Sequence, residues 1–161
     1  MGIENTMRPS NVLSGKSADI YGTINGRRYH CMHFTEYEAT IEYEKGDVKM
    51  LGRRMSGHKI NGMAGKYKGK CYYMFSELRE MAEEYKNGGP APIYDMELTN
   101  IEEGTLAGTQ KVWLKDCMPD SDVLAKADAN SEFLEEDVEG TFDDFEIPEK
   151  FNDDMPGYIE S

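Results

Sequence analysis

Two segments of the sequence alternate between apolar or glycine residues and polar or charged residues, and this pattern constrains the fold more than any other feature. In residues 35–45, TEYEATIEYEK, glutamate and threonine would occupy one face of a strand. In residues 65–74, GKYKGKCYYM, three lysines share one face, while two glycines on the other indicate close approach by a backbone or ring. Such period-two alternation predicts half-buried β-strands. If the strands are neighbours, each glutamate–lysine pair contributes roughly 0.2–1 kcal/mol.

The remaining sequence predicts further strands and a single helix. Asn25-Gly26 predicts a hairpin and Lys45-Gly46-Asp47 a turn. Apolar residues then recur at helical spacing until Asn87-Gly88-Gly89-Pro90 stops the helix. Later strands are expected near residues 92–100, 109–117 and 132–148, with a polar connection from Pro119. The predicted class is mainly β (α+β), a β-sandwich or barrel with one flanking α-helix.

A chain of 161 residues is expected to form one domain with a substantial core. No apolar run approaches the roughly 20 residues needed to span a bilayer, and no signal peptide is recognised, so no membrane association is expected. The predicted parts are a flexible N-terminal arm (1–16), the domain (17–148), an extended loop (51–63) and a helix (74–86) within it, and a C-terminal tail (149–161).

The net charge of −13 is concentrated in the C-terminal quarter. Residues 119–161 carry 15 acidic and 2 basic side chains. A globally acidic protein repels phosphate backbones, which disfavours sequence-independent nucleic-acid binding. We expect the acidic residues of the last extended run to form an acidic assembly surface. They are Glu135, Glu136, Asp137, Asp143 and Asp144.

The predicted loop, LGRRMSGHKINGM, is basic and lacks the features of a phosphate-binding loop. Gly52 and Gly57 have the spacing of a Walker loop, but His58 occupies the lysine position and no hydroxyl for magnesium follows. His30 and His33 would point to opposite faces of a strand and cannot share one metal ion. We therefore predict no catalytic residue, no metal site, no cofactor and no enzymatic activity.

Two interpretations of the basic loop stay open. It could be the contact of a small nucleic-acid-binding adaptor that uses residues 53–59, although only Tyr67 lies close enough in sequence to stack on bases. Alternatively, it could pair with acidic residues on another copy of the chain, since a basic loop and an acidic surface on one polypeptide suit head-to-tail association. The inter-subunit contacts would then be made by Arg53, Arg54, Met55, Ser56, Gly57, His58 and Lys59.

Two segments resemble the tail tube protein of contractile bacteriophage tails, above all the family found in phage-like elements of Gram-positive bacteria. They are MLGRRMSGHKINGMAGKYKG, followed by the single helix, and FLEEDVEGTFDDFEIPEKF. The resemblance covers roughly residues 12–151.

The resemblance implies a virion protein, assembled in the host cytoplasm, that forms hexameric rings stacked into a hollow tube inside a contractile sheath. It implies further copies, the tail sheath protein, the tape measure protein and the tail terminator and baseplate proteins as partners. DNA would pass through the bore without specific binding, and the same architecture serves phage-tail-like bacteriocins. Our hypothesis is that the alternating hairpin turns its charged face to the bore, through Glu36, Glu38, Glu42, Lys66, Lys68 and Lys70.

Overall fold

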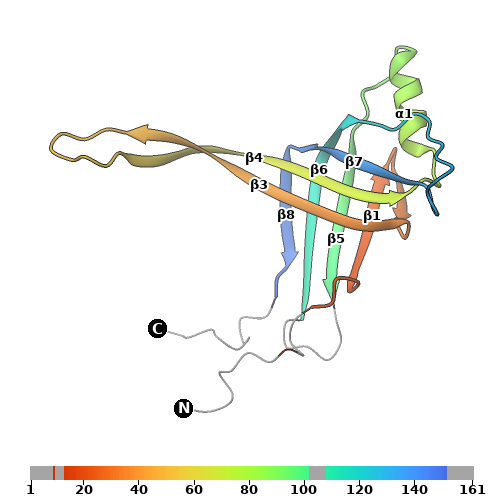
Figure 1. Ribbon diagram of the computed structural model, residues 1–161, viewed down its shortest axis with the longest axis horizontal. Helices are drawn as coiled ribbons and strands as arrows, with labels where there is room; N and C mark the ends of the chain where they lie inside the picture. The colour runs from red at the N-terminus through yellow and green to blue at the C-terminus, as the bar shows by residue number, and fades with distance from the viewer. Residues whose placement is uncertain (1–8, 10–12, 102–107, 152–161) are drawn as a thin grey trace. The chain divides into compact units, whose positions relative to one another are not determined.

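The protein is mainly β, with one helix, in the computed structural model (Figure 1). The structure describes residue 9, residues 13–101 and residues 108–151, so most of the predicted arm (1–16) and tail (149–161) lies outside it. The predicted fold class is confirmed. The elements, in chain order, are β1 (Ala18–Ile24), β2 (Arg27–His30), β3 (Phe34–Val48), β4 (Gly57–Tyr72), α1 (Glu77–Lys86), β5 (Tyr94–Ile101), β6 (Thr109–Ser121), β7 (Glu135–Phe142) and β8 (Asp144–Glu149).

The chain forms two compact units, where the sequence analysis expected one domain. Unit 1 comprises residues 1–32, 94–115 and 145–161, and unit 2 comprises residues 33–93 and 116–144. Strand β6 contributes its first half to unit 1 and its second half to unit 2. The division falls at Asp116, whose φ of 55° is one of two positive values outside glycine among the described residues.

Unit 1 contains antiparallel strands in the order β2-β1-β5-β6, with β8 paired to β6. The β1–β2 hairpin closes through Asn25 and Gly26, with φ values of 52° and 78°. Both central residues of a type I′ turn need positive φ, and Asn25 and Gly26 both have it. The predicted hairpin is therefore confirmed, together with the turn that closes it. Tyr94, Met96 and Leu114 are buried in this unit.

Unit 2 contains strands in the order β6-β7-β4-β3, together with α1. Its buried side chains come from β4, α1, β6 and β7. The helix begins at Glu77, later than the predicted residue 74. The predicted end of the helix is confirmed. Gly88 has a φ of 91°, and the Gly89 N–H donates to the Glu84 carbonyl. The buried hydrophobic residues of this unit are Tyr67, Cys71, Met81, Cys117, Val138 and Phe142.

Glycines and aromatic rings interlock across the buried face of unit 2. Gly65 pairs with Phe142, and a Cβ at Gly65 would overlap the Phe142 ring. Gly140 pairs with Tyr67, and a Cβ there would lie 2.6 Å from the Tyr67 hydroxyl. At Gly69 a Cβ would come within 3.0 Å of the Tyr37 ring. The predicted close approach at the two glycines of β4 is confirmed, because each leaves the space that a large ring fills.

The β3–β4 hairpin is longer than predicted, and its loop is shorter. Lys45, Gly46 and Asp47 do not form a turn but continue β3, and they pair with Ile60, Lys59 and His58. Asn61 is the bulged residue of β4, and a Cβ at Gly46 would lie 2.7 Å from the Asn61 amide. Gly46 is thus a close-approach glycine. The chain reverses between Lys49 and Ser56, where Gly52 has a φ of 76°.

Candidate assembly surfaces

The charged face of unit 2 is arranged around β4, which lies between β3 and β7. Lys70 lies opposite Glu36 on β3 and Asp137 on β7, and Lys68 lies opposite Glu38 and Glu139. Directly paired residues of an antiparallel sheet share a face. The lysine row of β4 therefore lies between two rows of carboxylates. We call this set the charged ladder: Glu36, Glu38, Glu42, Lys66, Lys68, Lys70, Asp137 and Glu139.

Two ion pairs in the charged ladder join β3 to β4. Lys66 Nζ lies 3.2 Å from Glu42 Oε2, and Lys68 Nζ lies 3.8 Å from Glu38 Oε2. All four side chains are more than half exposed, so each pair adds little to stability in water. The predicted meeting of the glutamate and lysine rows is confirmed. The bore-facing role of the six predicted residues stays a prediction.

The hairpin extends well past its support in the sheet. Pairing between β4 and β7 ends at Gly65 with Phe142, so residues 57–64 of β4 pair with β3 alone. Figure 1 shows this two-stranded arm running away from β7 to its end. A two-stranded ribbon without a third strand or a covering helix is only marginally stable in water. Such an arm gains stability when another surface covers it.

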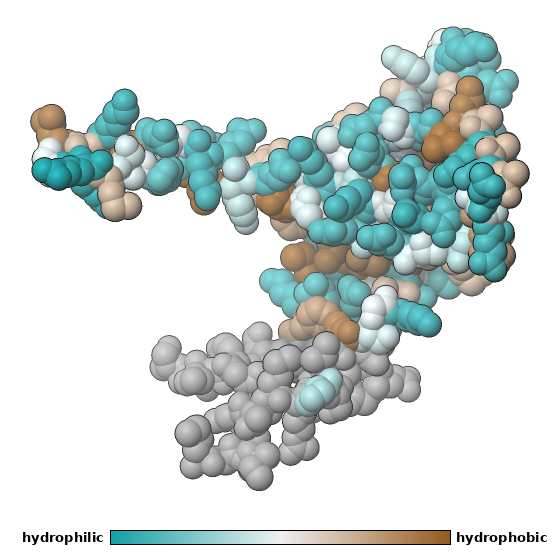
Figure 2. All heavy atoms as spheres, in the orientation of Figure 1, coloured by the Kyte–Doolittle hydropathy of each residue, from teal (hydrophilic) through white to brown (hydrophobic). Residues whose placement is uncertain are grey.

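The end of this arm, residues 48–60, combines basic and apolar side chains, and we call it the tip. It contains four Lys or Arg residues and no Asp or Glu. Leu51 is fully exposed and Met55 is 75% exposed. Figure 2 shows hydrophobic and hydrophilic side chains together at the end of the hairpin. Within the tip, His58 Nε2 lies 3.4 Å from Oδ1 of Asp47, the residue directly before the tip. Of the predicted inter-subunit residues, Arg53 to Ser56 lie in the turn, whereas Gly57, His58 and Lys59 belong to β4.

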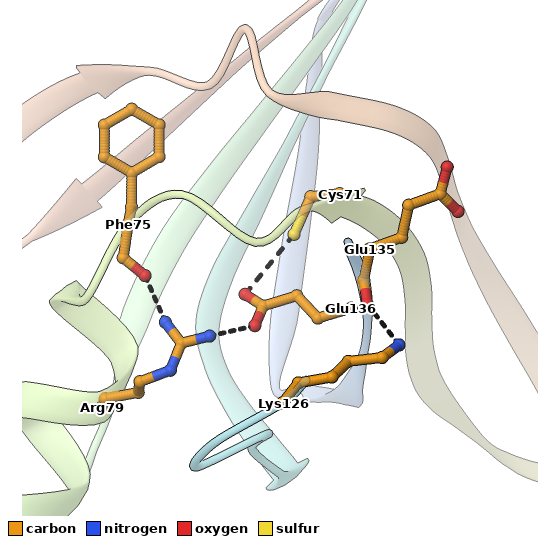
Figure 3. Close-up of polar contacts among 6 residues, drawn as sticks. All are labelled: Cys71, Phe75, Arg79, Lys126, Glu135 and Glu136. Carbon is orange, nitrogen blue, oxygen red and sulfur yellow. Dashed lines mark hydrogen bonds and ion pairs between the residues drawn. The ribbon is translucent and has the colours of Figure 1, made fainter. Parts of the chain in front are cut away.

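A buried ionic network attaches α1 to the rest of unit 2 (Figure 3). Arg79 donates from Nη2 to Glu136 Oε2 and from Nη1 to the Phe75 carbonyl. The Cys71 thiol donates to the other Glu136 oxygen at 3.6 Å. The Arg79 guanidinium also lies 4.2 Å from the centroid of the Tyr73 ring. Arg79 therefore links α1 to β7 and also to the segment directly before the helix.

This network corrects the predicted acidic surface. Glu136 is 8% exposed and both of its oxygens accept hydrogen bonds within unit 2, so it is not available to another subunit. The cause is the alternation of β7, which turns Glu136 to the same side as Val138 and Phe142. Asp137 belongs to the charged ladder, and Asp143 and Asp144 are exposed where β7 passes to β8. The five predicted residues therefore do not form one surface.

Two titratable groups near α1 have shifted pKa values. Burial raises the pKa of Asp122 above its ordinary value, and the attraction of Arg79 only partly opposes the shift. Burial lowers the pKa of His33, and Glu77 opposes that shift in the same way. The His33 ring lies 4.5 Å from the Phe75 ring and 5.0 Å from the Phe34 ring, centroid to centroid. Both groups are thus biased toward their neutral forms beside the start of α1.

Sequence reasoning missed Arg79, the cation on which this network depends. Its position beside the apolar stripe of the helix was visible, but many surface arginines occupy such positions. The partner of Arg79, Glu136, lies on the buried face of β7, and recognising this requires the register between β4 and β7. A strand prediction without register could not supply it.

Unit 1 carries a separate set of ion pairs on strands β2, β5, β6 and β8. Glu97 accepts contacts from Arg28 at 3.2 Å and from Lys111 at 3.5 Å. Lys115 Nζ lies 2.9 Å from Glu146 Oε1. Arg28 and Lys115 also lie over the rings of Tyr21 and Trp113, at 4.5 Å and 4.9 Å from the centroids. These charges already pair within the unit.

Three observations bear on the metal, membrane and nucleic-acid interpretations. Within residues 13–101 and 108–151, no three His, Cys, Asp or Glu side chains are placed to hold a metal ion. In that same part of the chain no helix has the length and apolar character of a membrane span. Tyr67, the aromatic residue that lies close to the basic loop in sequence, is 3% exposed and packs in the core. A stacking contact through Tyr67 is therefore excluded.

Comparisons with known proteins agree with these features. The family described as phage tail tube protein matches residues 5–149. The chain is 33% identical to phage-like element PBSX protein XkdM of Bacillus subtilis (strain 168) over 91% of this chain and 97% of that protein. It shares its fold with a chain in the sheath/tube terminator of an extracellular contractile injection system, PVC, in the extended state, at a TM-score of 0.64 and 9% identity, over 86% and 97% of the two chains. A chain in the baseplate of the anti-feeding prophage matches with a TM-score of 0.61 and 11% identity, over 84% and 95%. The chain belongs to the phage tail tube protein family, and is a structural component of a phage-type tail rather than an enzyme.

Proposed function

We propose that this protein is the subunit of the inner tail tube of a contractile phage tail or phage-tail-like particle, and that it assembles into stacked hexameric rings. The observation that carries the proposal is the family match over residues 5–149. The long two-stranded arm with a basic and apolar tip supports it, because such an arm needs a covering partner. The tube would lie inside the sheath and contact the sheath, tape measure, terminator and baseplate proteins.

In this proposal the charged ladder faces the bore. Five carboxylates and three lysines on one face give a negative balance, which repels the DNA backbone and favours sliding over binding. A tube built from a Glu38→Lys or Glu42→Lys variant should therefore pass DNA more slowly. Normal passage would count against this orientation of the ladder.

Electron microscopy of the concentrated, purified protein tests the proposal. Rings, or tubes with sixfold symmetry, are expected. Sedimentation over a range of concentrations provides the matched measurement in solution. A protein that stays strictly monomeric at every concentration, and that cannot be recovered in rings or cylinders from particles, would overturn the proposal.

A further inference from the structure

We propose that the tip of one subunit docks beside α1 on a second copy, on a surface that we call the α1 rim. The rim consists of the exposed aromatic and methionine side chains next to the helix and the carboxylates around them. This inference rests on the proposed function and names the acceptor for its inter-subunit arm. The rim residues are Tyr72, Met74, Phe75, Phe133, Glu80 and Glu132.

The apolar part of the rim comes from residues 72–75 and from Phe133, which contacts Tyr72. The Tyr72 and Phe133 rings meet edge to face, with their centroids 6.3 Å apart. Beside them, the Tyr73 N–H donates to the Leu134 carbonyl at 3.0 Å. Phe133 is 65% exposed and Met74 is 67% exposed. Phe75 follows Met74 and is 45% exposed. Large apolar side chains that gather on a surface mark an interaction site more often than isolated ones do.

Carboxylates surround this apolar cluster. Glu77 and Glu80 lie in the first turn of α1. Glu132 directly precedes Phe133, and Glu135 lies opposite Tyr72 in the register of β7 with β4. Lys126 donates from Nζ to the Glu135 carbonyl, and this one positive charge is outnumbered by the four carboxylates. The fitting partner is therefore an apolar segment that carries positive charge.

The tip has this composition. It carries Lys49, Arg53, Arg54 and Lys59 without a single acidic residue, together with the exposed side chains of Leu51 and Met55. Basic groups around an apolar centre complement acidic groups around an apolar cluster, and such matching sets partner choice and register.

The two surfaces cannot meet within one chain. The tip lies at the first residue of β4 and the rim at its last, and β4 has 16 residues. At about 3.3 Å per residue the strand separates them by roughly 50 Å. Figure 1 shows the end of the hairpin and α1 at opposite ends of unit 2. Two different patches on one chain give a head-to-tail contact, which closes into rings or continues as a filament.

Charge reversal in trans tests this contact. The tip variant is Arg53→Glu/Arg54→Glu and the rim variant is Glu80→Arg/Glu132→Arg, all at exposed positions. Each variant alone should assemble at least about tenfold less than the unmodified protein, because the two reversals cancel the net charge of one surface and place like charges opposite each other at the substituted positions. In an equimolar mixture the glutamates of a substituted tip can meet the arginines of a substituted rim, and an unmodified tip can meet an unmodified rim. The mixture should therefore recover assembly, measured by sedimentation and electron microscopy.

The control reverses two other acids, Asp143→Arg/Asp144→Arg, which the sequence analysis assigned to the acceptor. This variant should assemble normally and should not rescue the tip variant. If it fails alone and rescues the tip variant, or if the rim variant assembles normally, the α1 rim is not the acceptor. The proposed tube function is judged separately, on whether the unmodified protein forms rings or tubes.

Zero-length carbodiimide cross-linking of the unmodified assembly gives a readout that does not depend on any variant folding. It joins lysine amines to carboxylates in direct contact. Mass spectrometry should find Lys49 or Lys59 linked to the rim carboxylates Glu77, Glu80, Glu132 or Glu135. Links from the tip to carboxylates outside both the rim and the tip's own hairpin, such as Glu146 in unit 1, would overturn the proposal.

Discussion

At the scale of single residues, the buried face of unit 2 depends on glycines, because their lack of a Cβ atom leaves room for aromatic rings. Phe142 is 6% exposed and fills the space above Gly65, and Tyr67 fills the space above Gly140 in the same way. Neither ring has room to withdraw, because protein cores are packed about as densely as organic crystals. These glycines therefore act through packing, and none of them has a φ in the left-handed region.

A methyl group at Gly65 should destabilise the protein. The added Cβ of Gly65→Ala would overlap the Phe142 ring, and overpacking of this kind costs about 1–3 kcal/mol. Urea denaturation followed by circular dichroism measures the change. Gly62→Ala on the same strand is the matched control, since its Cβ would meet only the flexible Glu44 side chain at 3.4 Å. Equal midpoints for the two variants would show that the interlocking is not tight.

At the scale of elements, α1 is joined to the sheet of unit 2 by a charge as well as by apolar contacts. The helix buries only Met81 fully. Arg79 compensates by reaching Glu136 on β7 and lying over the Tyr73 ring. A buried ion pair adds little net stability over an apolar pair, yet losing one partner leaves an uncompensated charge.

Removing the cation alone should therefore be worse than removing both charges. Arg79→Met should lower the free energy of unfolding by about 3–5 kcal/mol. The double variant Arg79→Met/Glu136→Leu should recover most of that loss, as measured by denaturant titration. Lys86→Met, at an exposed position in the same helix, should change little. A double variant as unstable as Arg79→Met would mean that the ion pair itself stabilises the fold.

For the individual elements, the sequence predicted well which side chains share a strand face, but it predicted poorly where the strands and the helix begin and end. Period-two alternation placed Glu38 and Lys68 on faces that do meet, because side chains in a strand alternate without drift and opposite charges favour one pairing. Gly46 was read as a turn residue because a glycine that makes room for a bulge looks the same in sequence as one that bends the chain. Glu136 was expected at the surface because its burial depends on the β4–β7 register and on a cation from α1.

At the scale of the whole molecule, the charges are divided so that one chain offers both halves of an interaction. The tip is basic, and the region from β6 to β8 is strongly acidic. Long-range attraction between surfaces of opposite sign accelerates encounter, and dissolved salt weakens it.

Assembly should accordingly be sensitive to ionic strength. Raising sodium chloride from 0.05 M to 0.5 M shortens the Debye length to roughly a third, so the assembly rate should fall several-fold. Light scattering after dilution from denaturant follows the rate. The Arg53→Glu/Arg54→Glu variant, whose tip has no net charge, is the control and should show a weaker salt dependence. A rate independent of salt would indicate that apolar contacts alone drive assembly.

The division of the chain into a nearly continuous unit and an interrupted one also sets an order of events during folding. The β3–β4 hairpin joins residues that are close in sequence, so it closes with a small loss of chain entropy. Unit 1 must instead gather three segments, from residues before 33, from 94–115 and from beyond 144. Contacts between residues distant in sequence form slowly. The part of the hairpin that also pairs with β7 should therefore gain hydrogen-exchange protection before β1 pairs with β5, so a newly made chain completes the base of its docking arm before unit 1.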